Sequence, residues 1–226
     1  MREPEFQDRY EAGRVLAGHL LRYARAPGTL VLALPRGGVP VGAEVARQLG
    51  VPLDVFLVRK LGTPGHEELA MGAIASGGVR VLNREVMDEL NIGRDQLEDA
   101  TRREALELER RERSYREGRP PPDVRGRTVL LVDDGLATGT TMRAAVAALR
   151  IHEPASIVVA VPVAAVQSCE SLAQVADDIV CVRTPEPFYS VGLWYRDFAQ
   201  TEDDEVRALL TQAAREQAPA GAQPSA

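Results

Sequence analysis

Short apolar runs alternate with mixed polar and apolar segments along most of the chain. A short run that is apolar throughout is typical of a strand buried on both faces, as in parallel sheets. Such runs predict strands at residues 29–34, 53–58, 128–132, 156–161 and 178–182. The segments around them predict helices at residues 6–26, 40–49, 94–117, 140–151, 164–175 and 202–215. Strands that alternate with helices indicate βαβ units, so we predict an α/β fold with a five-stranded, mainly parallel sheet flanked by helices.

One segment departs from this alternation. Five glycines lie between residues 60 and 78. Together with Pro64 they predict a long loop, mobile at residues 62–70, with a short hairpin around residues 71–82. The helix at residues 94–117 has one modest apolar stripe, and its many charges are typical of a solvated face.

The length of 226 residues and the hydrophobic fraction of 45% suit one α/β domain with a small added subdomain. We expect this domain to cover residues 1–215. Residues 59–118 and 183–200 would contribute a flexible loop and a small hood subdomain. The tail at residues 216–226 is rich in Ala, Pro and Gln, and we expect it to be disordered.

Charge and cysteine content narrow the setting of the protein. A net charge of −6 gives no general case for binding nucleic acid. No apolar run approaches the roughly 20 residues that span a bilayer, and the charged start MREPEFQDRY does not resemble a secretory signal. Cys169 and Cys181 do not make a disulfide framework, so we expect two buried apolar residues in a reduced, cytoplasmic protein.

The sequence VLLVDDGLATGTT, at residues 129–141, is the most specific chemical motif of the chain. Its strand runs directly into Asp133 and Asp134, at the open edge of the predicted sheet. Carboxylates placed there accept hydrogen bonds from vicinal hydroxyls and attract a hydrated metal ion. Residues 135–141 predict a tight turn onto a helix N-terminus, which suits a phosphate monoester. An ordinary helix N-cap explains one acid, but neither the second acid nor the Thr/Gly cluster.

This segment closely resembles the signature of type I phosphoribosyltransferases that binds 5-phosphoribosyl-1-pyrophosphate (PRPP), and the resemblance extends over about residues 8–200. It implies that Asp133 and Asp134 contact the ribose hydroxyls and act with Mg²⁺, mainly through PRPP oxygens and water. The implied loop for the 5′-phosphate consists of Ala137, Thr138, Gly139, Thr140 and Thr141. The Gly-x₄-Gly-Lys pattern of a Walker A loop is absent.

The sequence PRGGV, at residues 35–39, resembles the pyrophosphate loop of the same family. Arg36 offers a fork of hydrogen-bond donors, and Gly37 and Gly38 allow backbone amides to face an anion. A generic Gly-Gly turn is the alternative.

Lys60 is the single lysine among 27 Lys and Arg residues. Positions that accept either residue have become arginine, so a retained lysine indicates a need for an ammonium group, although chance survival stays open. Arg59 and Lys60 begin a segment that resembles the family's flexible catalytic loop. We expect both to act in catalysis beside Asp133 and Asp134, with Lys60 stabilising the charge on the departing pyrophosphate. Residues 66–68 we interpret as facing solvent.

The resemblance implies transfer of the 5-phosphoribosyl group from PRPP to a nitrogenous small molecule, with release of pyrophosphate. The aromatic residues Phe188, Tyr189 and Trp194 are candidates for stacking on that acceptor, and packing in a hood core is equally open. A regulatory PRPP or nucleotide sensor without catalysis is the alternative function. No GxSxG motif supports hydrolysis by this chain. We expect no membrane or nucleic-acid partner, and a homodimer stays open.

Overall fold

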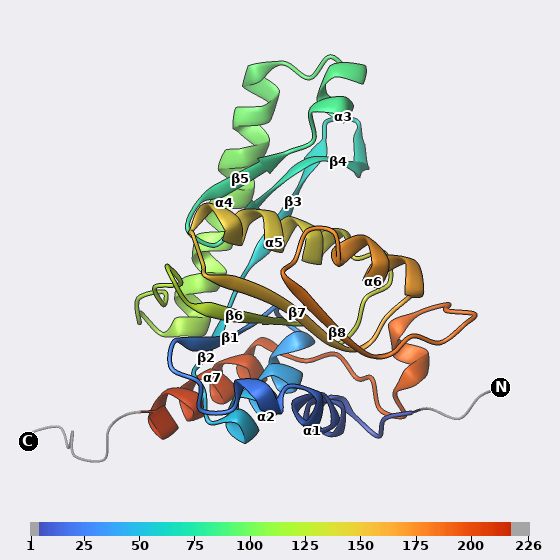
Figure 1. Cartoon of the computed structure of the whole chain (residues 1–226). Coiled ribbons are helices and arrows are strands. Elements are labelled where there is room, and N and C mark those ends of the chain that lie inside the picture. The colour runs from blue at the N-terminus through green and yellow to red at the C-terminus, as the bar shows by residue number, and fades with distance from the viewer. Residues whose placement is uncertain (1–4, 218–226) are drawn as a thin grey trace, which may run out of the picture.

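A five-stranded parallel sheet forms the core of the computed structural model, which describes residues 5–217 (Figure 1). The strands lie in the order β2 (Leu53–Val55), β1 (Thr29–Ala33), β6 (Thr128–Val132), β7 (Ser156–Val163) and β8 (Asp178–Arg183). All four neighbouring pairs are parallel. The fold class predicted from the sequence is therefore confirmed, and β6, which leads into the acidic motif, is the central strand.

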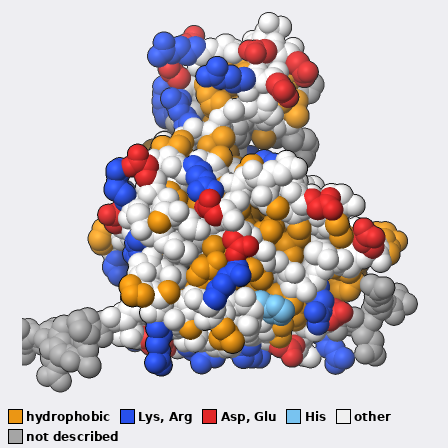
Figure 2. Space-filling view, viewed as in Figure 1, with side chains coloured by type: hydrophobic (Ala, Val, Ile, Leu, Met, Phe, Trp, Pro, Cys, Tyr) orange, Lys and Arg blue, Asp and Glu red, His pale blue; other side chains and the backbone are white. Residues whose placement is uncertain are grey.

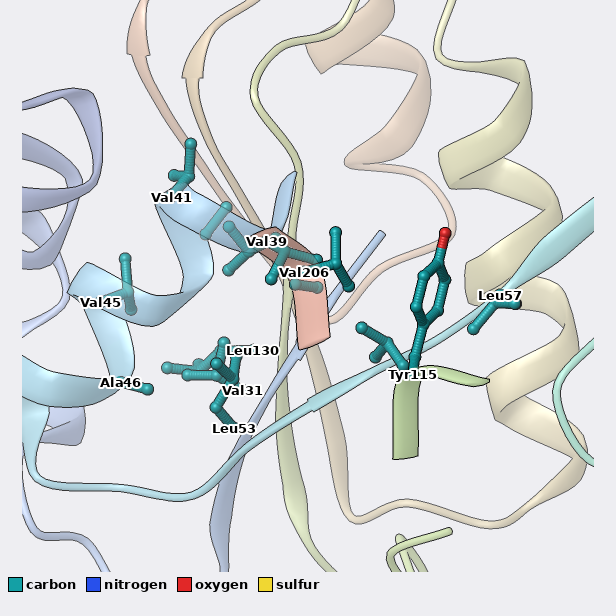
Figure 3. Packing of buried hydrophobic residues seen from close by; sticks show 14 of the residues in the cluster. Val31, Val39, Val41, Val45, Ala46, Leu53, Leu57, Tyr115, Leu130 and Val206 are labelled. Atoms are coloured by element: carbon teal, nitrogen blue, oxygen red, sulfur yellow. The ribbon is translucent and has the colours of Figure 1, made fainter. Parts of the chain in front are cut away.

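Helices cover both faces of this sheet (Figure 1). One face is covered by α1 (Arg9–His19), α2 (Gly38–Leu49) and α7 (Asp203–Gln217), and the other by α5 (Thr140–Ile151) and α6 (Val166–Leu172). Because successive strand residues point to opposite faces, Val31 and Leu130 pack with α2, as Figure 3 shows, whereas Leu30 and Leu131 pack with α5. Burial on both faces is the physical reason for the continuous apolar runs.

A second sheet rises above the core in Figure 1 and consists of β3 (Val58–Thr63), β4 (His66–Ala75) and β5 (Val79–Leu82). It packs with α3 (Arg84–Glu89) and α4 (Arg94–Arg116), and we call these five elements the hood. Charged side chains are scattered over the hood surface (Figure 2), and several on α4 pair with one another one turn apart. The charged face predicted for this helix is thus solvated.

The secondary structure of the hood differs from the long loop predicted at residues 60–78. Most of that segment forms the antiparallel pair β3–β4, and the hairpin predicted around residues 71–82 corresponds to β4–β5. The glycines serve this pairing rather than interrupting it. A Cβ atom on Gly72 would lie 2.5 Å from the carbonyl oxygen of Val81, so only glycine allows the two strands to approach. Gly77 has a φ of 81° in the turn that joins them.

Some helix ends also differ from their predicted positions. The first predicted helix is divided into α1 and a short 3₁₀ helix at Leu21–Tyr23. At the C-terminus, α7 continues through Gln217, so the start of the predicted tail at Glu216 is helical. The rest of that predicted tail lies outside the described residues. A second 3₁₀ helix, Val191–Trp194, lies in the aromatic segment before α7.

Cys169 and Cys181 are joined by a disulfide bond, so the expectation of two buried, reduced cysteines was wrong. Cys169 lies on α6 and Cys181 on β8, and both residues are only half-buried. The helix turns back to pack against the strand that follows it, which brings the two Cα atoms to 6.8 Å. Compositional reasoning about the cellular compartment could not register this local geometry. Within residues 5–217, no helix combines the length and the apolar character needed to cross a membrane.

Candidate functional site

Asp133 and Asp134 follow β6 at the carboxyl edge of the sheet. The backbone N–H of Asp134 donates to Oδ1 of Asp133 at 2.9 Å, and Nε of Arg9 donates to Oδ2 of Asp134 at 2.8 Å. Burial raises the pKa of Asp133 well above its usual value, and the neighbouring carboxylate adds to this shift. Burial also raises the pKa of Asp134, although the Arg9 guanidinium opposes that shift. Two acids held together away from bulk water are poised to accept hydrogen bonds from a ligand.

The loop before α2 packs directly onto these two acids. A Cβ atom on Gly37 would lie 2.1 Å from Oδ2 of Asp134, and one on Gly38 would lie 2.9 Å from the Cα atom of Asp133. Any side chain at either position would therefore displace the acidic motif. This need for space, rather than an unusual φ, accounts for both glycines. The structure thus brings the predicted pyrophosphate loop and the predicted ribose acids into one site.

Arg36 extends from the same loop toward the start of α7. Its NH1 atom lies 3.7 Å from Oε2 of Glu202 and 3.8 Å from Oδ1 of Asp203, and a third of its side chain is exposed. Such long, partly exposed ion pairs contribute little to stability. Arg36 can therefore exchange them for an anionic ligand at low cost.

Residues 137–141 connect β6 to α5 as a turn with exposed polar groups. Gly139 precedes the helix with a φ of 69°, a left-handed conformation that favours glycine. The hydroxyls of Thr138 and Thr140 lie 3.2 Å apart, and both side chains are exposed, as is Thr141. The first amides of a helix lack intrahelical acceptors, so the start of α5 presents free donors to an anion. Ala137 is held from behind, because its carbonyl accepts a hydrogen bond from Ser168 of α6 at 2.5 Å.

The structure gives Arg59 and Lys60 different surroundings. Arg59 forms an ion pair with Glu104 of α4, with distances of 2.7 Å from Nε and 2.6 Å from NH2 to Oε2. Lys60 is exposed and lines a cavity of about 620 Å³ between the hood and α5. Thr140 and Thr141 line the same cavity. The lone lysine therefore shares a space with the predicted phosphate loop, whereas Arg59 links two elements of the hood.

The three aromatic residues predicted to contact an acceptor do not share one surface. Trp194 is buried and Phe188 is half-buried, and both pack in a small cluster with Phe6 and Tyr195. Tyr189, by contrast, is 79% exposed. Of the three rings, only that of Tyr189 stands free for stacking.

A family model described as a phosphoribosyl transferase domain matches residues 6–186, more than half of the chain. The chain belongs to the phosphoribosyl transferase family. Two Mycobacterium tuberculosis proteins (strains CDC 1551 and H37Rv), each named "Putative phosphoribosyl transferase", are 46% identical over 217 residues, or 96% of this chain. The alignment covers 49% of each relative, so the chain spans about half the length of these curated proteins.

The crystal structure of TT1426 from Thermus thermophilus is also similar to this phosphoribosyl transferase. The two chains are 42% identical and superpose with a TM-score of 0.80. The match covers 92% of this chain and 98% of TT1426. The hood and the core sheet therefore occur together in a solved relative of nearly the same extent.

Two residues of this phosphoribosyl transferase site were missed by the sequence analysis. Arg9 reaches Asp134 from α1 across a separation of 125 residues, and the hydroxyl of Tyr195 donates to the Asp134 carbonyl at 2.6 Å. Neither residue belongs to a local motif. Tyr195 stood among the aromatic residues that drew attention, but the sequence did not show that it supports the acidic loop rather than facing a ligand.

Proposed function

We propose that this chain transfers the 5-phosphoribosyl group of PRPP to a nitrogenous acceptor and releases pyrophosphate. The observation that carries the proposal is the contact of Gly37 and Gly38 with Asp133 and Asp134. A loop suited to pyrophosphate and a pair of acids suited to ribose lie against each other, as two adjoining parts of one substrate require.

Each part of PRPP has a counterpart among the residues of the site. The carboxylates of Asp133 and Asp134 would accept hydrogen bonds from the 2′ and 3′ hydroxyls of the ribose. The amides and hydroxyls of residues 138–141 would hold the 5′-phosphate at the start of α5. The amides after Arg36, with its guanidinium, would hold the pyrophosphate group.

Transfer requires the bond between C1 of the ribose and the pyrophosphate oxygen to break. The electron pair leaves with pyrophosphate, and positive charge develops on the sugar until the acceptor nitrogen donates its own pair to C1. Arg36 and Lys60 would stabilise the negative charge that accumulates on the departing group. The hood would exclude water, which otherwise competes with the acceptor for the sugar cation.

The residues of the site fit a Mg²⁺ ion that is held largely by the substrate. Carboxylate oxygens are suitable ligands, and Asp133 and Asp134 lie at the open edge of the sheet. Over residues 5–217, however, His, Cys, Asp and Glu side chains nowhere gather in a group of three or more that could bind a metal. We therefore propose that PRPP oxygens and water complete its coordination, and that Mg²⁺ adds positive charge beside the diphosphate when bound.

A non-catalytic PRPP or nucleotide sensor of the same fold is the second candidate. Two observations favour it. Ala137 has no group that handles a proton on an acceptor, and Trp194 is buried rather than free for stacking. A sensor would bind PRPP through the same residues without releasing pyrophosphate.

A panel of acceptors distinguishes these functions. The protein is incubated with PRPP, Mg²⁺ and, separately, adenine, hypoxanthine, guanine, orotate and uracil, and pyrophosphate release is measured. PRPP binding is measured in parallel by calorimetry, with the Asp133→Asn, Asp134→Asn double variant as the control. Release with one acceptor, lost in the control, supports transfer. PRPP binding without release supports the sensor, and the absence of PRPP binding contradicts both.

A further inference from the structure

Arg9 joins the N-terminal helix to the second acid of the site. Its Nε atom donates to Oδ2 of Asp134 at 2.8 Å. The exposed fractions of the two side chains are 11% and 15%, so this ion pair is largely shielded from solvent. A shielded charge pair constrains geometry much more than an exposed surface pair does.

Two further contacts fix the orientation of the Arg9 guanidinium. Its Cζ atom lies 3.9 Å from the centre of the Phe198 ring, and NH1 donates to the carbonyl oxygen of Ala199 at 2.7 Å. Both contacts come from the segment that precedes α7. Planar stacking with a fork of directed donors is a geometry that arginine provides and lysine does not.

The surroundings of Asp134 show which of its oxygens is engaged. Oδ2 lies beside both Arg9 and Gly37, since a Cβ atom on Gly37 would be 2.1 Å from Oδ2 and 3.1 Å from Nε of Arg9. The backbone carbonyl of Asp134 is held separately by the hydroxyl of Tyr195. These contacts fix the rotation of the carboxylate through one oxygen and leave Oδ1 as the other acceptor.

We propose that Arg9 is a positioning residue, which holds Oδ2 of Asp134 so that Oδ1 faces the ribose hydroxyls of PRPP. This inference rests on the proposed function. Arg9 does not touch the substrate in this arrangement and acts through Asp134. Phe198 acts one step further away, because its ring holds the guanidinium in place.

A double-mutant cycle tests the dependence of Arg9 on Asp134. PRPP dissociation constants are measured by calorimetry, with Mg²⁺ present, for the wild type, Arg9→Gln, Asp134→Asn and the double variant. We expect Arg9→Gln to weaken binding about tenfold, the order of one charge-assisted hydrogen bond. The double variant should bind about as weakly as Asp134→Asn alone, because Arg9 then has no carboxylate to position.

Two further variants separate positioning from folding. Arg9→Lys keeps the charge but not the fork, so it should recover part of the lost affinity. Arg14→Gln removes a half-exposed arginine of the same helix, 3.9 Å from Glu44, and should leave PRPP binding unchanged. If Arg9→Gln fails to fold, Arg9→Lys and Phe198→Leu carry the test, and both should weaken binding by a smaller factor.

Three outcomes would overturn the inference. Tighter PRPP binding by Arg9→Gln would mean that Arg9 shields Asp134 from the substrate. Additive losses in the double variant would mean that Arg9 acts independently of Asp134. Unchanged affinity in the folded Arg9 variants would leave it no role in binding. Absence of PRPP binding by the wild type would instead overturn the proposed function, together with this inference.

Discussion

The hydroxyl of Tyr195 donates a hydrogen bond to the backbone carbonyl of Asp134, with 2.6 Å between the two oxygens. Burial raises the pKa of Tyr195, so this hydroxyl keeps its proton and remains a donor. The ring packs between Phe6 and Phe198, with centroid distances of 5.5 and 5.0 Å. The aromatic segment is therefore close to the site, but much of it supports the acidic loop from below. An acceptor would contact the exposed part of the segment near Tyr189.

The Asp133→Asn, Asp134→Asn double variant should lose PRPP binding while remaining folded. We expect the dissociation constant to rise at least 100-fold, about 3 kcal/mol, because neutral amides are weaker acceptors for ribose hydroxyls. Folding should survive, since burial already disfavours the charged form of both groups. Calorimetry and thermal unfolding measure the two effects. The exposed hood pair Asp88→Asn, Asp95→Asn is the matched control, and an unchanged PRPP affinity in the site variant would contradict the assignment.

Lys60→Ala should reduce turnover far more than PRPP affinity. The ammonium matters most as charge accumulates on the departing pyrophosphate, so its loss should appear mainly in kcat. We expect a reduction of about 100-fold, comparable to the removal of one group that stabilises a transition state. Steady-state kinetics with the best acceptor, beside PRPP calorimetry, provide the comparison. Arg103→Ala removes an exposed hood cation as a control, and equal losses of turnover and affinity would restrict Lys60 to ground-state binding.

Replacing both cysteines by serine should destabilise the protein. The disulfide closes a short loop with a sequence separation of 12, for which chain entropy predicts a contribution of about 2–3 kcal/mol. Urea denaturation should give a correspondingly lower unfolding free energy for the Cys169→Ser, Cys181→Ser variant. Wild-type protein treated with a reducing agent serves as the comparison and should behave like the variant. Detection of two free thiols in untreated, folded protein by mass spectrometry would show that the bond does not form.

The parts of the fold and site that the sequence predicted are those encoded locally. Residues 129–141 contain a strand, two acids and a turn in one stretch, and the rule that parallel strands end at one edge places the loop at residues 35–39 beside them. The contact of Gly37 with Asp134 adds the spatial detail.

What the sequence did not reveal depends on contacts between distant segments. Nothing near Arg9 in the sequence indicates Asp134, because α1 reaches the site only after the sheet has formed. The glycines at residues 60–78 were interpreted by their local freedom, yet Gly72 is required by a neighbouring strand. Trp194 is amphipathic, and only its tertiary packing decides that its ring is buried.

Hypoxanthine and guanine should be poor acceptors for this protein. In the 6-oxopurine members of the family that the signature resembles, a carboxylate commonly lies three residues after the second acid and handles a proton of the base. Here that position is Ala137, which is exposed at the edge of the site and has only a methyl group. General acid–base catalysis typically contributes 10²–10⁴-fold, so kcat/KM for both purines should be at least about 100-fold below that of a true acceptor.

Ala137→Asp provides the converse test, because the exposed position accepts a larger side chain without disturbing the core. The Ser168 hydroxyl holds the backbone carbonyl of residue 137, so the new carboxylate would start from a fixed point beside the phosphate loop. We expect this variant to gain activity with hypoxanthine, while Ala137→Asn, of equal size but unable to accept the proton, should not. Steady-state kinetics with hypoxanthine, guanine, adenine, orotate and uracil compare the three proteins. Efficient turnover of either 6-oxopurine by the wild type would show that Ala137 is no barrier, and that the proton leaves by another route, such as a preformed anion of the base.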